Sequence, residues 1–119
     1  MRFHLVALAL VLAAPPALAA DAQHGKQVYT ACLACHGDAT HPATIGPSLA
    51  GVIGRKAGSV PDFRYSPAMK RSAIVWDDAS LRAYIVDPQA AVKGNRMPFG
   101  GVGNAADADD LVAYLHTLQ

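Results

Sequence analysis

Apolar residues form one unbroken run near the start of the chain and fall into helical spacings afterwards. Residues 5–14 are all apolar. Later, apolar positions recur every three or four residues within 22–34, from Asp77 to just before Pro88, and from Asn104 to about Leu118. This spacing puts them on one face of a helix, so three main helices are predicted. A shorter helix is predicted over 67–71, and residues 37–58, with five glycines and two prolines, are predicted as a long loop. The pattern indicates an all-α domain.

Two of these helices carry recognisable start signals. Asp77 and Asp78 precede the second main helix and can accept hydrogen bonds from its first free N–H groups. Asn104 opens the last helix with Asp107 three positions later, a variant of the capping box.

The first apolar run has the layout of a secretory signal peptide. It follows Met1-Arg2, and Ala17-Leu18-Ala19 is a small-x-small cleavage pattern. A retained membrane anchor is the alternative, but a spanning helix needs roughly 20 apolar residues and this run is about half that length. We therefore predict that residues 1–20 are a signal peptide, that cleavage follows Ala19 or Ala20, and that one domain of residues 21–119 is exported to the periplasm.

Composition excludes several kinds of partner. The chain has ten Lys and Arg residues against nine acidic ones, and without Arg2 the two signs are equal. The sequence has no excess of basic residues that would bind nucleic acid and no polybasic patch that would bind a membrane surface. No later stretch is apolar enough for stable membrane insertion once the signal is cleaved. The exported domain is small and has few large apolar residues, so a flat apolar cofactor is expected to fill its middle.

Cys32-Leu33-Ala34-Cys35-His36 is the most informative stretch. A disulfide would suit an exported protein with two cysteines. A zinc site would need four ligands, and no second Cys/His pair is present. Covalent haem attachment is the third interpretation, because C-x-x-C-H is its signature. At helical pitch both sulfurs reach one edge of a porphyrin, and the next histidine lies beneath the iron, which favours haem.

A sixth iron ligand would come from elsewhere in the chain. Met97 lies in a Gly/Pro-rich loop that can bring a thioether to the open face of a haem, whereas Met69 lies on the predicted short helix. A packing role is the alternative for Met97. Three further histidines are rival ligands: His24, His41 and His116.

The chain resembles class I cytochromes c, in particular the mitochondrial-type branch with its bacterial soluble relatives. The likeness covers residues 25–118, nearly all of the predicted domain. It rests on landmarks in family order: Gly25 and Tyr29, Cys32 to His36, Ile45 to Leu49, Gly51 to Gly58, Phe63 to Pro67, Trp76, Leu81 to Pro88, Met97-Pro98-Phe99 and Leu111 to Leu115.

The resemblance implies a cytochrome c fold, with three main helices, short helices and long loops around one haem c. The haem would be bound through Cys32 and Cys35, with His36 and Met97 as the iron ligands. It also implies roles for six other residues. The carbonyl of Pro47 would accept a hydrogen bond from His36. The buried haem propionate would be bound by Arg55, Tyr65 and Trp76. Tyr84 would hydrogen-bond the Met97 sulfur, and Asn95 would lie near the propionates.

The function implied is that of a monomeric carrier of single electrons, not an enzyme. Its partners would be redox proteins: a membrane quinol-oxidising complex, a terminal oxidase or a periplasmic dehydrogenase. The docking face departs from the family, since Ala31, Gln89 and Ala90 stand where lysines are usual. A partial positive set remains in Lys26, Lys93 and Arg96, so weaker electrostatic steering is expected. Two alternatives stay open: a peroxidase or gas binder formed when Met97 leaves the iron, and a subunit docked on one dehydrogenase.

Overall fold

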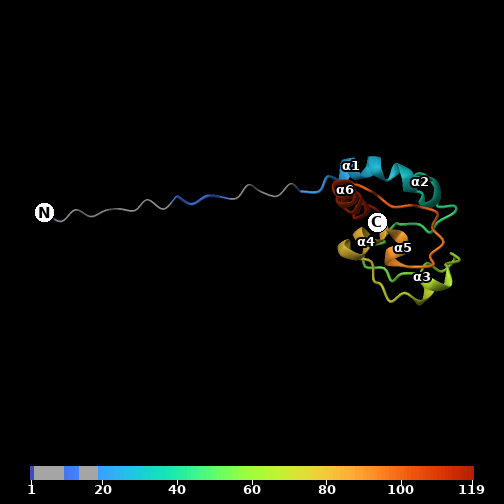
Figure 1. Ribbon diagram of the computed structural model, residues 1–119. Helices are drawn as coiled ribbons and strands as arrows, with labels where there is room; N and C mark the ends of the chain where they lie inside the picture. The colour runs from blue at the N-terminus through green and yellow to red at the C-terminus, as the bar shows by residue number, and fades with distance from the viewer. Residues whose placement is uncertain (2–9, 14–18) are drawn as a thin grey trace.

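A computed structural model describes residue 1, residues 10–13 and residues 19–119 (Figure 1). Most of the predicted signal peptide, residues 1–20, lies outside the described residues. Among the described residues there are six helices and no strand. The helices are α1 (Ala22–Val28), α2 (Thr30–His36), α3 (Pro67–Arg71), α4 (Asp78–Val86), α5 (Pro88–Ala91) and α6 (Ala105–Leu115). The all-α prediction is confirmed, and no helix of the described part is long and apolar enough to cross a membrane.

The observed helices differ from the predicted ones in three places. The first predicted helix is divided at Tyr29, whose carbonyl accepts from the N–H groups of both Cys32 and Leu33. A short helix, α5, begins at Pro88, where the sequence predicted only the end of α4. The last helix ends at Leu115 rather than near Leu118 and closes in a turn.

Polar side chains fix the beginnings of the helices as the sequence indicated. Asp77 accepts from the N–H of Ser80, whose hydroxyl accepts in return from the N–H of Asp77, so α4 starts with a complete capping box. Asn104 accepts from the N–H of Asp107 at 3.0 Å, which is one half of such a box. These caps define where α4 and α6 start relative to the loops that precede them.

The crossing of α1 and α6 holds the two ends of the domain together (Figure 1). Gly25 is the buried residue of α1, and a Cβ at this position would overlap the carbonyl oxygen of Asp110 on α6. Beside this contact the rings of Tyr29 and Tyr114 pack with their centroids 5.0 Å apart. Only glycine permits this close approach of the two backbones.

Gly25→Ala is therefore expected to destabilise the protein. Overpacking of this kind costs about 2 kcal/mol, because the two helices must move apart. The measurement is the free energy of unfolding from a denaturant titration. Gly103→Ala is the control, since an added Cβ there meets no atom within 4 Å. Equal stability of the two variants would contradict the close-packed crossing.

An ion pair on the same crossing should make stability depend on pH. His24 Nδ1 lies 2.8 Å from Asp110 Oδ2, and this hydrogen bond raises the pKa of His24 above its ordinary value of 6.5. The Asp110 carboxylate also accepts the N–H of Asp21 at 2.7 Å, a bond that lowers the pKa of Asp110 and keeps it ionised.

A raised histidine pKa stabilises the fold most when the ring is protonated. The contribution is complete below pH 6.5 and is lost as the pH rises through the higher pKa of the folded state. We expect the wild-type melting temperature to fall over this range relative to that of His24→Gln. If the melting temperatures of the two proteins change with pH in the same way, the ion pair contributes nothing to stability.

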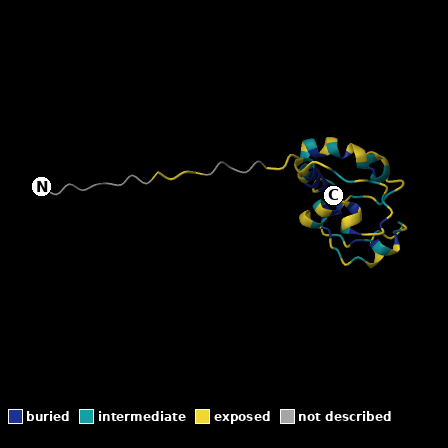
Figure 2. Cartoon of the chain, in the orientation of Figure 1, coloured by how far each residue is buried: buried dark blue, intermediate teal, exposed yellow. Residues whose placement is uncertain are grey.

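Buried residues gather where the helices face the middle of the domain (Figure 2). On α6 they include Leu111 and Leu115, and on α4 they include Leu81 and Tyr84. The ring of Trp76 packs edge-on against that of Tyr84, with centroids 5.2 Å apart. Several of these core residues also line a cavity, so the core of this domain is arranged around a space.

Candidate cofactor site

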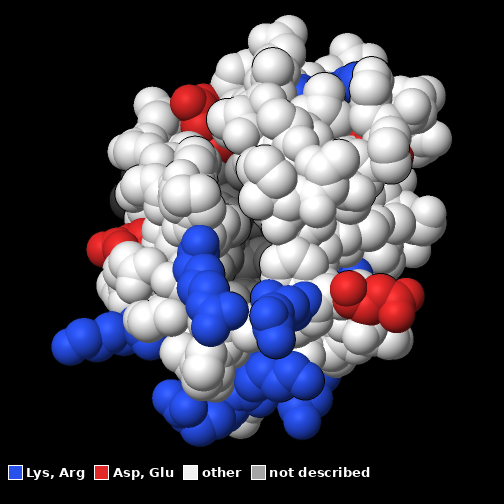
Figure 3. Space-filling model, turned by 90° about the vertical axis from the view of Figure 1, so that its right-hand side faces the viewer, with Lys and Arg blue, Asp and Glu red and all other residues white. Residues whose placement is uncertain are grey.

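The cavity has a volume of about 500 Å³ and opens on one face of the molecule, where it appears as a central hollow (Figure 3). This volume is within the range of small-molecule sites, which are lined mainly by apolar and aromatic side chains. All ten residues predicted for the site line this one cavity, and their roles toward a cofactor stay predictions. They are Cys32, Cys35, His36, Pro47, Arg55, Tyr65, Trp76, Tyr84, Asn95 and Met97.

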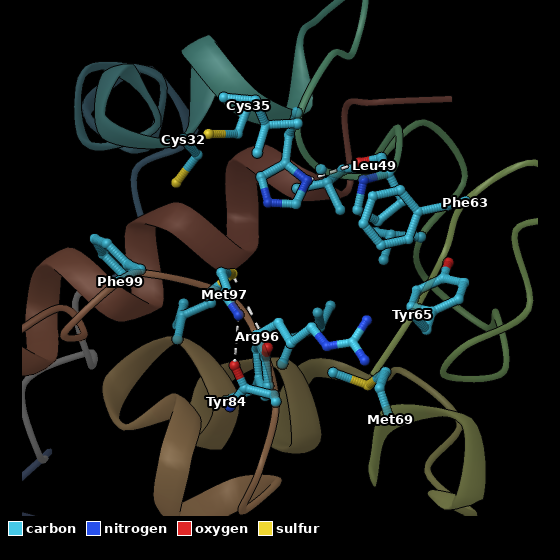
Figure 4. A pocket seen from close by; sticks show the side chains of 18 of the residues that line it. Cys32, Cys35, Leu49, Phe63, Tyr65, Met69, Tyr84, Arg96, Met97 and Phe99 are labelled. Atoms are coloured by element: carbon cyan, nitrogen blue, oxygen red, sulfur yellow. Dashed lines mark hydrogen bonds between the residues drawn. The ribbon is translucent and has the colours of Figure 1, made fainter. Parts of the chain in front are cut away.

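One wall of the cavity is formed by α2, which carries both cysteines (Figure 4). Cys32 and Cys35 are free thiols, so the disulfide interpretation is not the arrangement found. Burial raises the pKa of the Cys32 thiol. Among the described residues no group of three His, Cys, Asp or Glu side chains could hold a metal ion, as a zinc site would require. Two adjacent thiols facing an apolar cavity suit covalent attachment of a cofactor.

His36 is held by the loop that follows α2. Its Nδ1 lies 2.7 Å from the carbonyl oxygen of Pro47, and since a carbonyl only accepts, Nδ1 carries the proton and donates. Burial lowers the pKa of His36, which favours the neutral ring. Gly46 packs against the imidazole so closely that an added Cβ would lie 2.7 Å from Cε1. The ring is therefore fixed as a neutral imidazole with the Nε2 lone pair free to bind a metal.

The opposite side of the cavity carries Met97 and Tyr84, which face the two cysteines across the space (Figure 4). The Tyr84 hydroxyl lies 4.0 Å from the Met97 sulfur and donates to it. Burial raises the pKa of Tyr84 to about 12, so the hydroxyl keeps its proton. A thioether positioned by a hydrogen bond from a phenol leaves a second sulfur lone pair for another partner.

Asn95 lines the cavity as expected, and its side chain is bonded to the backbone around it. Its side-chain NH₂ donates to the carbonyls of Pro88 and Val92, each at 2.9 Å, and its side-chain oxygen accepts the N–H of Met97 at 2.9 Å. Both amide hydrogens are used by the backbone, so Asn95 has none left for a propionate. Its buried side chain instead anchors the Met97 loop on α5.

Met69 is a second methionine in the cavity. It comes from α3, is 8% exposed, and lies on the same side as Met97, near Tyr65 (Figure 4). Its backbone N–H is capped by Ser66 at 3.1 Å. Among the described residues no tyrosine hydroxyl is bonded to its sulfur, whereas the Met97 sulfur accepts from Tyr84.

The polar part of the cavity is built from loop residues. Arg55 donates to the carbonyl of Ser48 at 2.9 Å, and burial lowers the pKa of its guanidinium. The Tyr65 oxygen accepts the N–H of Val60 at 3.1 Å, so its own hydrogen remains free to donate. Trp76 is buried and makes no side-chain hydrogen bond within the described part of the chain. These three groups could together bind an anionic substituent of a cofactor.

Some lining residues were not predicted from the sequence. They include Phe63, Arg64, Met69 and Arg96. Phe63 and Arg64 belong to the same family landmark as Tyr65, Arg96 precedes Met97, and Met69 was considered only as a rival to Met97. Arg96 was expected on a docking surface; it is exposed and also lines the cavity.

Comparison with known proteins gives consistent matches. The family model described as Cytochrome c matches residues 22–119. Cytochrome c2 of Rhodomicrobium vannielii is 41% identical over 119 residues, covering 98% of this chain and 94% of that protein. Cytochrome c2 of Rhodoblastus acidophilus is 44% identical, covering 85% of this chain and 95% of that protein. The solved structure of cytochrome cH from Methylobacterium extorquens has a TM-score of 0.76 and 38% identity, covering 82% of this chain and 98% of that one.

Proposed function

The chain belongs to the cytochrome c family, and on that premise we propose that it is a periplasmic carrier of single electrons with His36 and Met97 as its iron ligands. Family membership makes it a monohaem electron carrier, not an enzyme, with one covalently attached haem c. The ligand pair, the export and the partners are the proposed parts.

The residues present fit this cofactor. Two thiols at C-x-x-C spacing face an apolar cavity of about 500 Å³, beside the neutral imidazole of His36 and opposite the Met97 thioether. The lining holds three arginines, Arg55, Arg64 and Arg96, and no aspartate, which suits a ring that carries carboxylates. When bound, the haem supplies an iron that changes its charge by one electron.

The chain's residues then act as tethers, ligands and positioning groups. Cys32 and Cys35 would hold the ring edge, and His36 would present Nε2 because Pro47 fixes the other nitrogen. The Tyr84 hydroxyl would hold the Met97 sulfur, and the Asn95 side chain would hold the Met97 backbone N–H. Two protein ligands would fill both axial positions, and a methionine ligand raises the reduction potential. The observation that carries this proposal is that both ligand side chains are fixed by independent hydrogen bonds on facing walls.

A redox titration with carbon monoxide as a probe tests the proposal. We expect a single one-electron curve, with about 59 mV per decade of the ferric-to-ferrous ratio. The ferrous spectrum should not change when carbon monoxide is added, because His36 and Met97 would leave no position on the iron for it. Carbon monoxide binding to the resting protein would contradict the carrier and favour the gas-binding or peroxidase alternative.

Export is the second part of the proposal. Residues 1–20 are proposed to be a signal peptide and residues 21–119 the mature domain, supported by the apolar run and the Ala17-Leu18-Ala19 pattern. Intact-mass measurement of protein from a periplasmic fraction should give a chain that begins at Ala20 or Asp21, with one haem attached. A protein that keeps its first 20 residues would contradict this.

The partner is proposed to be a redox protein with an acidic docking surface. Lys and Arg side chains gather along one side of the hollow (Figure 3). Lys70 and Arg71 end α3, and exposed Arg64 lines the cavity, so a positive edge lies beside the cofactor site. The aspartates at the α1–α6 crossing are placed elsewhere. A quinol-oxidising complex, a terminal oxidase or a periplasmic dehydrogenase would meet this edge through complementary charge.

A further inference from the structure

Arg96 lines the cavity at its mouth and is also exposed to solvent. It precedes Met97 in the loop and is one of the lining residues. Figure 4 shows its side chain reaching from that loop toward Tyr65. Within the described part of the chain no hydrogen bond or ion pair joins its guanidinium to another side chain, whereas Arg82 pairs with Asp109 at 2.6 Å. The Arg96 guanidinium is a cation at the cavity mouth without a protein anion.

The cavity contains more positive charge than one carboxylate requires. Arg55, Arg64 and Arg96 all line it, and none of the nine acidic residues of the chain does. Arg64 and Arg96 are exposed, so their guanidinium groups keep water until an anion binds, and a planar guanidinium is a strong partner for a carboxylate. A haem carries two carboxylates, and Arg55 with Tyr65 and Trp76 forms a place for one of them. The second carboxylate would lie at the cavity mouth, where a separate cation can pair with it.

The backbone on both sides of Arg96 is fixed, which makes it the best placed of the remaining two arginines. The carbonyl of Asn95 accepts from Gln89 at 3.0 Å, and the N–H of Met97 donates to the Asn95 side chain at 2.9 Å. A group that holds the Arg96 side chain therefore also restrains Met97. The planar guanidinium can bind both oxygens of a carboxylate at once, which a lysine cannot do.

We propose that Arg96 binds the second haem carboxylate at the mouth of the cavity, which ties the Met97 loop to the cofactor and raises the reduction potential. The proposal rests on the haem-binding role of the cavity but not on which residue is the sixth ligand. Neutralising a carboxylate near the iron favours the ferrous state, because the extra positive charge of ferric iron then has less negative charge beside it.

Redox titration of four proteins tests this: wild type, Arg96→Gln, Arg96→Lys and Lys93→Gln. Lys93 is exposed in the same loop and does not line the cavity, so Lys93→Gln removes an equal charge three residues away. At a fixed potential, Arg96→Gln is expected to raise the ferric-to-ferrous ratio about tenfold, equal to about 59 mV for one electron. The ratio for Arg96→Lys should lie between the ratios for Arg96→Gln and wild type. The ratio for Lys93→Gln should differ little from that of wild type.

Added salt provides a second readout. A direct ion pair at the cavity mouth is screened less than a free surface charge, so the Arg96→Gln shift should persist at 1 M salt. Equal shifts in Arg96→Gln and Lys93→Gln, or a shift that disappears in high salt, would show that Arg96 is only a surface charge. Either result would overturn this proposal while leaving haem binding and electron transfer intact.

Discussion

Cys32→Ser/Cys35→Ser, purified without haem, is expected to lack a cooperatively folded core at 25 °C. The cavity of about 500 Å³ lies at the centre of the domain, and buried residues such as Trp76, Tyr84 and Leu111 form both its lining and the core. The cavity opens on one face, so without the ring water would reach its apolar lining and the core would lose the burial of those side chains. Burial of one large apolar side chain contributes about 1.5–3 kcal/mol, and a typical domain is stable by only about 5–15 kcal/mol, so the loss of several is enough to unfold it.

Far-ultraviolet circular dichroism and a denaturant titration measure this effect directly. We expect low helicity and no cooperative transition in the haem-free variant, against a cooperative transition in the haem-bound wild type. The single variant Cys32→Ser keeps one thioether and serves as the control, because it should retain haem and fold. A fully helical haem-free double variant with a cooperative transition would show that the cofactor is not part of the core.

Met97→Leu is expected to open the iron and lower the reduction potential. Leucine has nearly the volume of methionine but no sulfur, so packing against Tyr84 is largely kept while the ligand is lost. Methionine ligation raises the potential, and its loss should raise the ferric-to-ferrous ratio at a fixed potential more than tenfold, which is a fall of more than about 59 mV. The ferrous variant should also bind carbon monoxide.

Met69→Leu is the matched control for this change. It alters the other methionine of the cavity in the same way. We expect ferrous Met69→Leu not to bind carbon monoxide and its reduction potential to stay near that of wild type. A reversal of the two phenotypes would assign the sixth position to Met69.

Local signals in the sequence predicted much of the site. The C-x-x-C-H spacing depends only on helical pitch, so it placed both thiols and His36 on one wall before any tertiary structure was known. The Gly/Pro-rich setting of Met97 predicted a loop, and that loop lines the cavity. The caps at Asp77 and Asn104 were predictable because capping uses neighbours three residues apart.

Features set by tertiary contacts were not predictable. The division between α1 and α2 falls at Tyr29, whose hydroxyl donates to the Gly37 carbonyl at 2.6 Å and whose ring packs on Tyr114. The role of Asn95 depends on carbonyls of α5, a helix of four residues that is too short to show a periodic pattern. The direction of the Arg96 side chain depends on the path of its loop, so the sequence predicted its exposure but not its place in the cavity lining.

Proton NMR of the reduced protein, with its methionine methyl groups labelled with carbon-13, tests the central claim most directly. The porphyrin ring current shields atoms held above the ring plane, so a methionine bound to iron gives one methyl signal far upfield of ordinary positions. The chain has three methionines, and cleavage of the signal peptide would leave Met69 and Met97. We expect two methyl signals, one of them far upfield. The upfield signal should be absent in Met97→Leu and retained in Met69→Leu. No upfield signal, or one that persists in Met97→Leu, would contradict ligation of the iron by Met97.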